Sequence, residues 1–211
     1  MIRQADEHVH DIYTIANTVT VLRLILVPLF FAVMINGTND RLAFILFAVA
    51  ASTDWLDGQI ARRTGTVTAI GKAIDPLVDR LLIASGVIGL YMEHRLPLWV
   101  PVVLVARDVV LGYGVWRLET LYHCRMPVTM AGKTTTAILL LGFGDLILGW
   151  PMIPGLGLIE NAALPGLGSQ SAALGIWFVY VGIILSIGSA VGYGSTYGRT
   201  AREARGRSSA R

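Results

Sequence analysis

Four aspartates at helical spacing are the residues of this sequence best suited to chemistry. Asp54 and Asp57 stand three residues apart, and Asp75 and Asp79 stand four residues apart. At about 100° per residue, each pair occupies one face of a helix. If the two helices are antiparallel neighbours, the four carboxylates converge and repel one another unless cations are present. Mg²⁺ is typically held by a few carboxylates together with substrate phosphates, so this pattern indicates a metal–phosphate site.

Small residues share the helix faces that carry these acids. Gly58 and Ala61 accompany the first pair, and Gly71 accompanies the second. They leave space where larger side chains would block a ligand. The simpler interpretation of a single aspartate at a helix end is a cap or an ion pair with a nearby cation. The nearest cations are Arg62, Arg63 and Arg80. Four acids at this spacing, beside small residues, favour the metal site.

The composition shows what kind of chain must position these acids. Of the 211 residues, 54% are hydrophobic and 15% are charged, and the mean hydropathy is +0.62. Soluble proteins carry about 25% charged residues. These values argue against a disordered chain, a basic nucleic-acid-binding domain and most soluble enzymes. The single cysteine, Cys124, excludes an internal disulfide and a thiolate metal cluster.

Apolar segments of membrane-spanning length recur along the chain, since a span needs about 20 residues. We expect six helices. The second leads directly into Asp54 and Asp57, and the third reaches membrane length only if it includes the preceding segment, which carries Asp75 and Asp79. The apolar segments are 16–35, 42–52, 81–92, 96–116, 134–150 and 172–193. The fold class is therefore predicted to be all-α, a polytopic integral membrane protein built as a bundle of six transmembrane helices.

The distribution of Lys and Arg predicts the orientation, because short cytoplasmic loops hold most of these cations. They concentrate between the second and third segments, between the fourth and fifth, and in the C-terminal tail, whereas the opposite side has only Arg41 and Arg95. Both termini and the aspartates are then cytoplasmic. The segment 151–170 is rich in Gly and Pro, contains no Lys or Arg, and is predicted to be an irregular loop on the other side.

One domain is expected over residues 1–198, followed by a basic cytoplasmic tail at 199–211. Residues 1–14 lack the basic start and small-residue cleavage site of a signal peptide, so we expect them to be retained. Their apolar positions recur at helical spacing, which is compatible with a helix lying in the membrane interface or with a frayed terminus. The arginines of the tail are expected to contact anionic lipid headgroups, with solvated charge as the alternative.

Read as one string, the central residues form Asp54-x₂-Asp57-Gly58-x₂-Ala61-Arg62-x₈-Gly71-x₃-Asp75-x₃-Asp79. This string resembles the complete signature of the CDP-alcohol phosphatidyltransferase family, without a departure at any signature position. The resemblance extends to the first segment, where four residues match the opening pattern of the family. They are Asn17, Thr20, Arg23 and Pro28. Members of that family have six transmembrane helices and a cytoplasmic active site, and bacterial members lie in the plasma membrane.

The resemblance implies a transfer from a CDP-linked lipid that depends on Mg²⁺ or Mn²⁺, with two ions in the site and CMP as the leaving group. Carried over by position, Asp54, Asp57 and Asp75 would be metal ligands, and Asp79 would be both a ligand and the general base. The residues that would contact the CDP part are Gly58, Ala61, Arg62 and Gly71. The planar guanidinium of Arg62 suits a diphosphate, although a positive-inside anchor is its simpler interpretation. A homodimer is expected by analogy only.

The signature leaves the alcohol acceptor open. The pair Arg107-Asp108 resembles CMP-forming cardiolipin synthases, whose acceptor is phosphatidylglycerol. Thr135 stands where enzymes that use glycerol 3-phosphate have a second lysine, and a dianionic phosphate would need more cations than a lipid diester. We therefore favour phosphatidylglycerol over glycerol 3-phosphate, with inositol phosphates well behind. The residues proposed to bind the acceptor are Arg107, Arg117, Arg125 and Lys133.

Two other classes of protein place carboxylates inside helical bundles. A transporter usually has them near the bilayer midplane between inverted repeats, but here they stand at helix ends and no repeat is visible. An intramembrane prenyltransferase also binds a metal–diphosphate with aspartates, yet it lacks the Asp-Gly-x₂-Ala-Arg segment and would release pyrophosphate. Metal-dependent release of CMP would separate the transferase from both alternatives.

Overall fold

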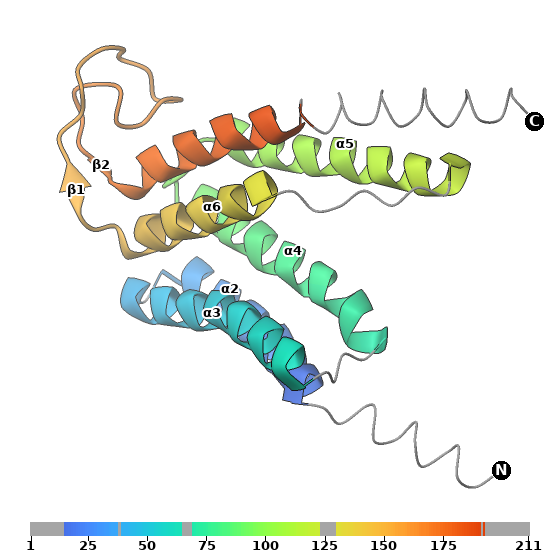
Figure 1. Ribbon diagram of the computed structural model, residues 1–211. Helices are drawn as coiled ribbons and strands as arrows, with labels where there is room; N and C mark the ends of the chain where they lie inside the picture. The colour runs from blue at the N-terminus through green and yellow to red at the C-terminus, as the bar shows by residue number, and fades with distance from the viewer. Residues whose placement is uncertain (1–14, 38, 65–68, 123–129, 191, 193–211) are drawn as a thin grey trace, which may run out of the picture. The chain divides into compact units, whose positions relative to one another are not determined.

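A computed structural model describes residues 15–37, 39–64, 69–122, 130–190 and 192 (Figure 1). Side chains are described from residue 20 in the first helix, up to residue 53 in the second, and from residue 77 in the third. The predicted interfacial segment 1–14 and the basic tail 199–211 lie outside the described residues.

The described chain is α-helical apart from two very short strands. The helices are α2 (Ile15–Ile35), α3 (Asp40–Thr64), α4 (Ala69–Met92), α5 (Trp99–Tyr122), α6 (Met130–Leu148) and the helical residues 175–190. Each predicted apolar segment overlaps one of these helices, which confirms the all-α class, although the segment 172–193 begins with two strand residues. Helices α3 and α4 continue without interruption through the aspartates.

The Gly/Pro-rich segment is more regular than predicted. Strand β1 (Met152–Ile153) pairs with β2 (Ala172–Ala173) in antiparallel orientation, with Met152 opposite Ala173. Apolar periodicity carries no signal for such a ladder, because the pairing joins two ends of one loop through backbone groups alone.

The chain divides into two compact units. The first contains α2, α3, α4 and residues 143–151, and the second contains α5, residues 130–142 and the chain from Met152 onward. In the first unit, α2 packs against both α3 and α4, and those two helices contact each other over a smaller area. The aspartates predicted to form the site all belong to this first unit.

Helix α2 buries one face whose residues are spaced alternately by three and four positions. These residues are Thr20, Arg23, Val27, Phe30 and Met34. This spacing follows from the 3.6-residue period of the helix. The face is polar at its N-terminal end and apolar beyond it. Helix α2 therefore brings an arginine into the packed interface of the first unit.

A tight connection joins α2 to α3 and makes them an antiparallel pair (Figure 1). Gly37 ends α2 with a φ of 60°, a conformation that glycine adopts without strain, and its N–H donates to the carbonyl of Met34 at 3.0 Å. Asn39 caps α3, because its side-chain oxygen accepts a hydrogen bond from the N–H of Leu42 at 3.0 Å. The two caps fix where each helix begins and ends, and so fix which residues face each other.

Small residues let the helices of each unit approach closely. A Cβ added at Gly89 of α4 would lie 2.7 Å from the sulfur of Met34 in α2. In the second unit, a Cβ at Gly142 of α6 would lie 3.0 Å from the carbonyl oxygen of Gly175. Close approach through glycines is characteristic of helix packing in membranes.

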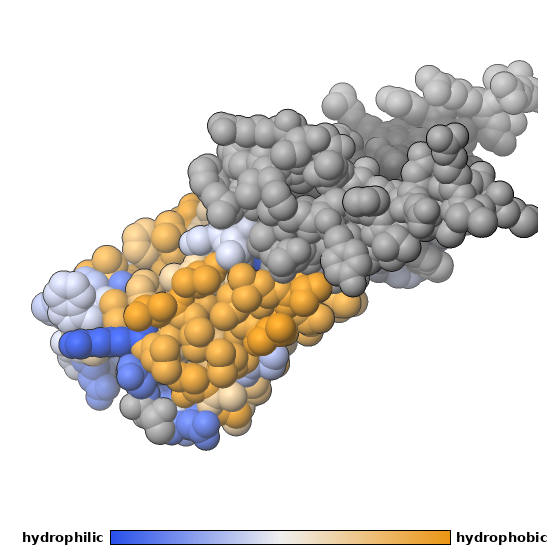
Figure 2. All heavy atoms as spheres, turned by 90° about the horizontal axis from the view of Figure 1, so that it is seen from below, coloured by the Kyte–Doolittle hydropathy of each residue, from blue (hydrophilic) through white to orange (hydrophobic). Residues whose placement is uncertain are grey.

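Apolar side chains also cover much of the outside of the molecule. Figure 2 shows one face on which they form a broad surface, bordered at one end by hydrophilic residues. On α2 and α3 the exposed apolar side chains include Val21, Leu22, Leu24, Ile25, Leu29, Leu42, Ile45 and Val49. Within the described part of the chain, no helix combines the length with the sustained apolar character of a membrane-crossing segment.

Candidate functional site

An ion pair between α2 and α4 is the central feature of the candidate site. Nη1 of Arg23 donates a hydrogen bond to Oδ1 of Asp79 at 2.8 Å. The side chain of Arg23 is completely buried, whereas that of Asp79 is 42% exposed. A buried guanidinium is stable only when it is paired and hydrogen-bonded. The pair therefore fixes the Asp79 carboxylate at the surface of the packed interface, where a ligand can reach it.

The two carboxylates of α3 continue the buried stripe of that helix. Ala43, Phe47 and Ala50 are buried at spacings of four and three residues. The next positions in this series are Asp54 and Asp57, and the backbone stays helical through both. By helix periodicity, both positions fall on the same stripe of α3 as Phe47.

The level of these acids along the helices follows from one aromatic contact. The rings of Phe30 in α2 and Phe47 in α3 lie 5.3 Å apart between centroids. The two helices are antiparallel, so residues that lie side by side are found by counting backward in α2 and forward in α3. Two turns, or about 10 Å, from the Phe30–Phe47 contact lead to a second pair of positions at the same height along the helix axes. Those residues are Arg23 and Asp54. The buried arginine therefore stands level with the first aspartate of α3 as well as beside Asp79.

Helix α4 carries the other two acids in the same way. Val78 and Leu82 are buried toward α2, and Asp75 and Gly71 stand three and seven residues before Val78. These positions continue the buried stripe toward the N-terminus of α4. By helix periodicity, Asp75 and Gly71 share the face of α4 that carries Val78.

The remaining signature residues lie on α3, one turn or two beyond the first aspartates. They are Gly58, Ala61 and Arg62. Among the side chains that the structure describes, no group of three His, Cys, Asp or Glu residues is close enough to hold a metal ion. Of the four aspartates, only Asp79 has its side chain described. The donor set itself fits a hard divalent cation, because four carboxylates supply only oxygen ligands and the adjacent positions are small.

An apolar groove begins beside the ion pair. It has a volume of about 370 Å³ and runs along α2 and α4. Leu24 and Val78, which line it, are the chain neighbours of Arg23 and Asp79. The other lining residues are Val27, Pro28, Phe31, Leu81, Ala84, Ser85 and Ile88. A molecule with a charged head and an apolar tail could place the head at the carboxylates and the tail in this groove.

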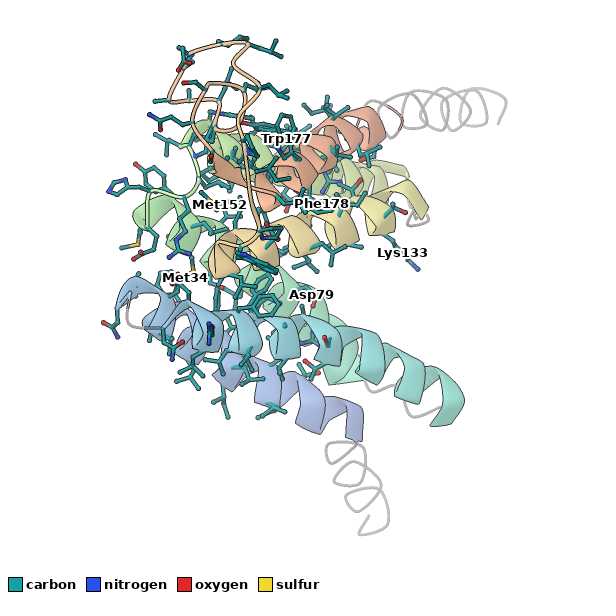
Figure 3. The ribbon with its side chains drawn as sticks, turned by 90° about the vertical axis from the view of Figure 1, so that its left-hand side faces the viewer. Met34, Asp79, Lys133, Met152, Trp177 and Phe178 are labelled. Carbon is teal, nitrogen blue, oxygen red and sulfur yellow. The ribbon has the colours of Figure 1, made fainter. Side chains whose placement is uncertain are left out.

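The residues predicted to bind the acceptor all belong to the second unit. Arg107 of α5 donates a hydrogen bond from Nη1 to Oδ1 of its neighbour Asp108 at 2.7 Å, and Nη2 lies 3.4 Å from the hydroxyl of Ser189. Arg117 and Lys133 are exposed, and Figure 3 shows Lys133 extending away from α6. Arg125 lies outside the described residues. Among the described candidates, only Arg107 is partly buried and ion-paired.

Sequence reasoning did not identify Arg23 as the partner of Asp79. Arg62, Arg63 and Arg80 were weighed instead, because they are close in sequence. The signal was present, since Arg23 is the only charge in an apolar segment of twenty residues. A charge at such a position requires a partner, and the partner is found 56 residues away.

Comparison with known proteins agrees with the signature. The chain matches the family described as CDP-alcohol phosphatidyltransferase over residues 13–188. A probable phosphatidylglycerophosphate synthase of Mycobacterium tuberculosis is 36% identical over 142 residues, covering 65% of this chain and 67% of that protein. A CMP-forming cardiolipin synthase of Streptomyces coelicolor is 34% identical over 148 residues, covering 66% of this chain and 69% of that protein.

A third relative matches a shorter region of the chain. The CDP-diacylglycerol–glycerol-3-phosphate 3-phosphatidyltransferase of Pseudomonas fluorescens is 40% identical over 103 residues, covering 46% of this chain and 52% of that protein. The family is membrane-embedded and uses a divalent metal ion. With its signature intact and most of its length matched, the chain belongs to the CDP-alcohol phosphatidyltransferase family and is a transferase of phospholipid biosynthesis.

Proposed function

We propose that this enzyme transfers the phosphatidyl group of CDP-diacylglycerol to a glycerol-type alcohol, with release of CMP. The observation that carries the proposal is the buried Arg23–Asp79 pair, which stands level with the start of the acidic stripe of α3. Three helices would then contribute to one polar site within an otherwise apolar interface. Such a site can hold a charged diphosphate next to membrane lipid.

The residues that would hold the divalent ions, Mg²⁺ or Mn²⁺ and two in number, are Asp54, Asp57, Asp75 and Asp79. When bound, the ions supply charge neutralisation at the diphosphate and at the departing phosphate of CMP. The Arg23 guanidinium lies 2.8 Å from Oδ1 of Asp79 and would hold this ligand in place. Arg62 would donate hydrogen bonds to the diphosphate, and the small residues Gly58, Ala61 and Gly71 would leave room for it.

The reaction then needs one proton acceptor and one leaving group. The hydroxyl oxygen of the acceptor forms a bond to the phosphorus that carries diacylglycerol, while the bond from this phosphorus to the oxygen of CMP breaks. CMP leaves with the electron pair of that bond, and the hydroxyl proton passes to the carboxylate of Asp79.

The groove beside the ion pair supports a lipid donor. Its lining is apolar except for Ser85, and it starts one residue from both Arg23 and Asp79. One acyl chain of CDP-diacylglycerol in the groove would bring the diphosphate to the aspartates. An acyl chain that enters the groove from the bilayer leaves one apolar surrounding for another, so the groove would orient the donor through packing rather than through removal of the chain from water.

The membrane arrangement completes the proposal. The six helices would form a transmembrane bundle, with both termini, the four aspartates and most cations on the cytoplasmic side of a bacterial plasma membrane. The broad apolar surface in Figure 2 supports contact with lipid. The basic residues 199–211 would then lie close to anionic headgroups.

For the acceptor, we favour phosphatidylglycerol, which would make the enzyme a CMP-forming cardiolipin synthase. Two observations support this choice over a phosphate dianion. The guanidinium of Arg107 is already paired with Asp108, and Thr135 is buried at the position where a second lysine would be expected. Both reduce the positive charge available to a phosphate monoester.

Glycerol 3-phosphate is the second candidate acceptor. It is favoured by the 36% identity to the probable phosphatidylglycerophosphate synthase, which is slightly above the 34% to the cardiolipin synthase. Lys133 and Arg117 are exposed and would be the cations available to bind it.

One assay tests donor and acceptor together. Purified enzyme in phospholipid vesicles is incubated with radiolabelled CDP-diacylglycerol and Mg²⁺, and each acceptor is added in turn. We expect release of CMP and formation of cardiolipin with phosphatidylglycerol. Phosphatidylglycerophosphate formed from glycerol 3-phosphate alone would overturn the acceptor, whereas absence of CMP release with every acceptor would overturn the reaction. Binding of Mn²⁺ to the substrate-free protein, followed by electron paramagnetic resonance, tests the metal site separately.

A further inference from the structure

The loop between α6 and the last helix exposes an unusual number of apolar side chains. Met152, Leu156, Leu158 and Ile159 are each at least half exposed, and Leu158 reaches 70%. Between Pro151 and Ala172 the only charged residue is Glu160. Exposed apolar clusters of this kind mark surfaces that bind a protein, a ligand or a membrane.

The backbone of the loop is hydrogen-bonded within the loop itself. The N–H groups of Leu156, Gly157 and Leu158 donate to carbonyls of residues 166–168 at 2.8 to 3.0 Å. At Gly155 an added Cβ would collide with the carbonyl oxygens of Gly168 and Gln170, so the two halves of the loop lie in close contact. Satisfied backbone groups remove the main cost of moving a loop out of water.

Aromatic residues anchor this loop to the helices of its own unit. Nε1 of Trp99, at the start of α5, donates to the carbonyl of Ala163 at 2.6 Å. The hydroxyl of Tyr180 donates to the carbonyl of Pro165 at 2.8 Å, and the Tyr180 ring stacks on that of Trp99. Trp and Tyr are enriched where the headgroups of a bilayer meet its hydrocarbon, so these anchors place the loop at that level.

Glu160 limits how deep the loop can go. Hydrogen bonds from the side chain and then the backbone of Ser169 lower the pKa of this fully exposed carboxyl. It therefore stays charged at neutral pH and remains in contact with water. A loop that holds one ionised carboxylate on its surface and extends leucines beside it is suited to an interface, where one side is wet and the other apolar.

We propose that residues 152–171 form an interfacial anchor, in which Leu156, Leu158 and Ile159 insert into the headgroup region of the outer leaflet. The inference rests on the membrane embedding proposed above. We assign lipid as the partner of this loop because the exposed apolar side chains of the unit continue along the last helix at Val181 and Ile184. Without any Lys or Arg, the loop binds through apolar area, so charge on the lipid is not required.

Site-specific fluorescence tests the anchor in the full-length enzyme. Cys124 is first replaced by Ser, and an environment-sensitive label is attached to a new cysteine at residue 158, 170 or 184. Gln170 is exposed on the same loop but polar, and Ile184 is 69% exposed on the last helix. The protein is placed in phosphatidylcholine vesicles that carry nitroxide lipids labelled near the headgroup or deep in the acyl chain.

We expect the label at 158 to be quenched by the shallow nitroxide, the label at 184 by the deep nitroxide, and the label at 170 mainly by iodide in the water. Quenching at 158 should be unchanged when anionic lipid or salt is added. Iodide quenching at 158 equal to that at 170 would overturn the anchor, and so would a blue-shifted label at 158 that no lipid quenches, because that result indicates a protein partner. If 184 is also unquenched by lipid, the membrane embedding itself fails.

Discussion

Two arginine–aspartate pairs in the first unit have nearly the same geometry and very different surroundings. Arg23 meets Asp79 at 2.8 Å, and Arg95 meets Asp40 at 2.7 Å. The two carboxylates are similarly exposed, at 42% and 46%, but the guanidinium of Arg23 is fully buried while that of Arg95 is 26% exposed. The two pairs therefore differ in the burial of the guanidinium and not in the exposure of the carboxylate.

This difference shows what each pair is suited to do. Arg95 also donates to the carbonyls of Leu146 and Ile147, at 3.3 and 2.7 Å, so it closes the end of α6 and ties it to the start of α3. Its role is structural. Arg23 lies instead within the packed interface and presents a carboxylate to the outside, an arrangement that costs desolvation and is retained for function more often than for stability.

The strongest test of this contrast is to neutralise each carboxylate. Asp79→Asn should reduce turnover by at least about 100-fold, because removing a general base costs about 10²- to 10⁴-fold and a metal ligand is lost as well. Asp40→Asn, which removes an equally exposed carboxylate from an equally short pair, should leave turnover close to normal. CMP release in vesicles measures both.

Donor binding is measured with the same two variants. We expect Asp79→Asn to be less stable, because buried Arg23 keeps a hydrogen-bond acceptor but loses its counter-ion, and still to fold and bind CDP-diacylglycerol, since the apolar groove is unchanged. Near-normal turnover in Asp79→Asn would remove this residue from the reaction. Equal losses in both variants would mean that the two pairs do not differ as described.

The arginines should differ in stability. Arg23→Met leaves Asp79 without its buried cation, and loss of one partner of a buried pair costs about 3–5 kcal/mol. Because Asp79 is half-exposed and can be hydrated, we expect the lower end of that range. Arg95→Met should cost about 1 kcal/mol, as for other exposed pairs. Thermal unfolding in detergent measures both, and Arg23→Lys should recover part of the loss.

The Arg23→Lys variant also shows whether Arg23 orients the carboxylate of Asp79 or only stabilises the fold. If Arg23 acts through Asp79, Arg23→Lys should regain stability more fully than affinity for Mn²⁺, because a lysine keeps the charge but loses the planar fork that orients the carboxylate. Equal recovery of both quantities would assign Arg23 a structural role only.

The helices and the helix faces of this fold follow from the sequence, but the pairing of the helices does not. Apolar runs gave the position of each helix, and a period of 3.6 residues placed the aspartates of α3 and α4 on common faces. Periodicity does not say which helix a face meets. Arg23 and Asp79 are 56 residues apart, and only the tertiary structure shows them in contact.

The pair Arg107–Asp108 in the second unit extends the comparison to the acceptor. The two residues are chain neighbours, so Asp108 neutralises a guanidinium of its own helix. Asp108→Asn should free positive charge and raise the use of glycerol 3-phosphate relative to phosphatidylglycerol by about fivefold, equivalent to about 1 kcal/mol. The ratio of the two products measures this shift. An unchanged ratio would separate Arg107 from acceptor selection.

The smallest expected effect concerns salt. Exposed pairs are screened by ions because the Debye length falls from about 10 Å at 0.1 M to about 3 Å at 1 M, whereas a buried guanidinium is not reached. A double-mutant cycle on Arg95 and Asp40 should therefore lose most of its coupling, a few tenths of a kcal/mol, over that range. The cycle on Arg23 and Asp79 should keep its coupling, because the cation of that pair has no contact with water. Equal salt dependence in the two cycles would show that Arg23 is hydrated in solution, and the distinction between a structural and a functional pair would then have to rest on turnover alone.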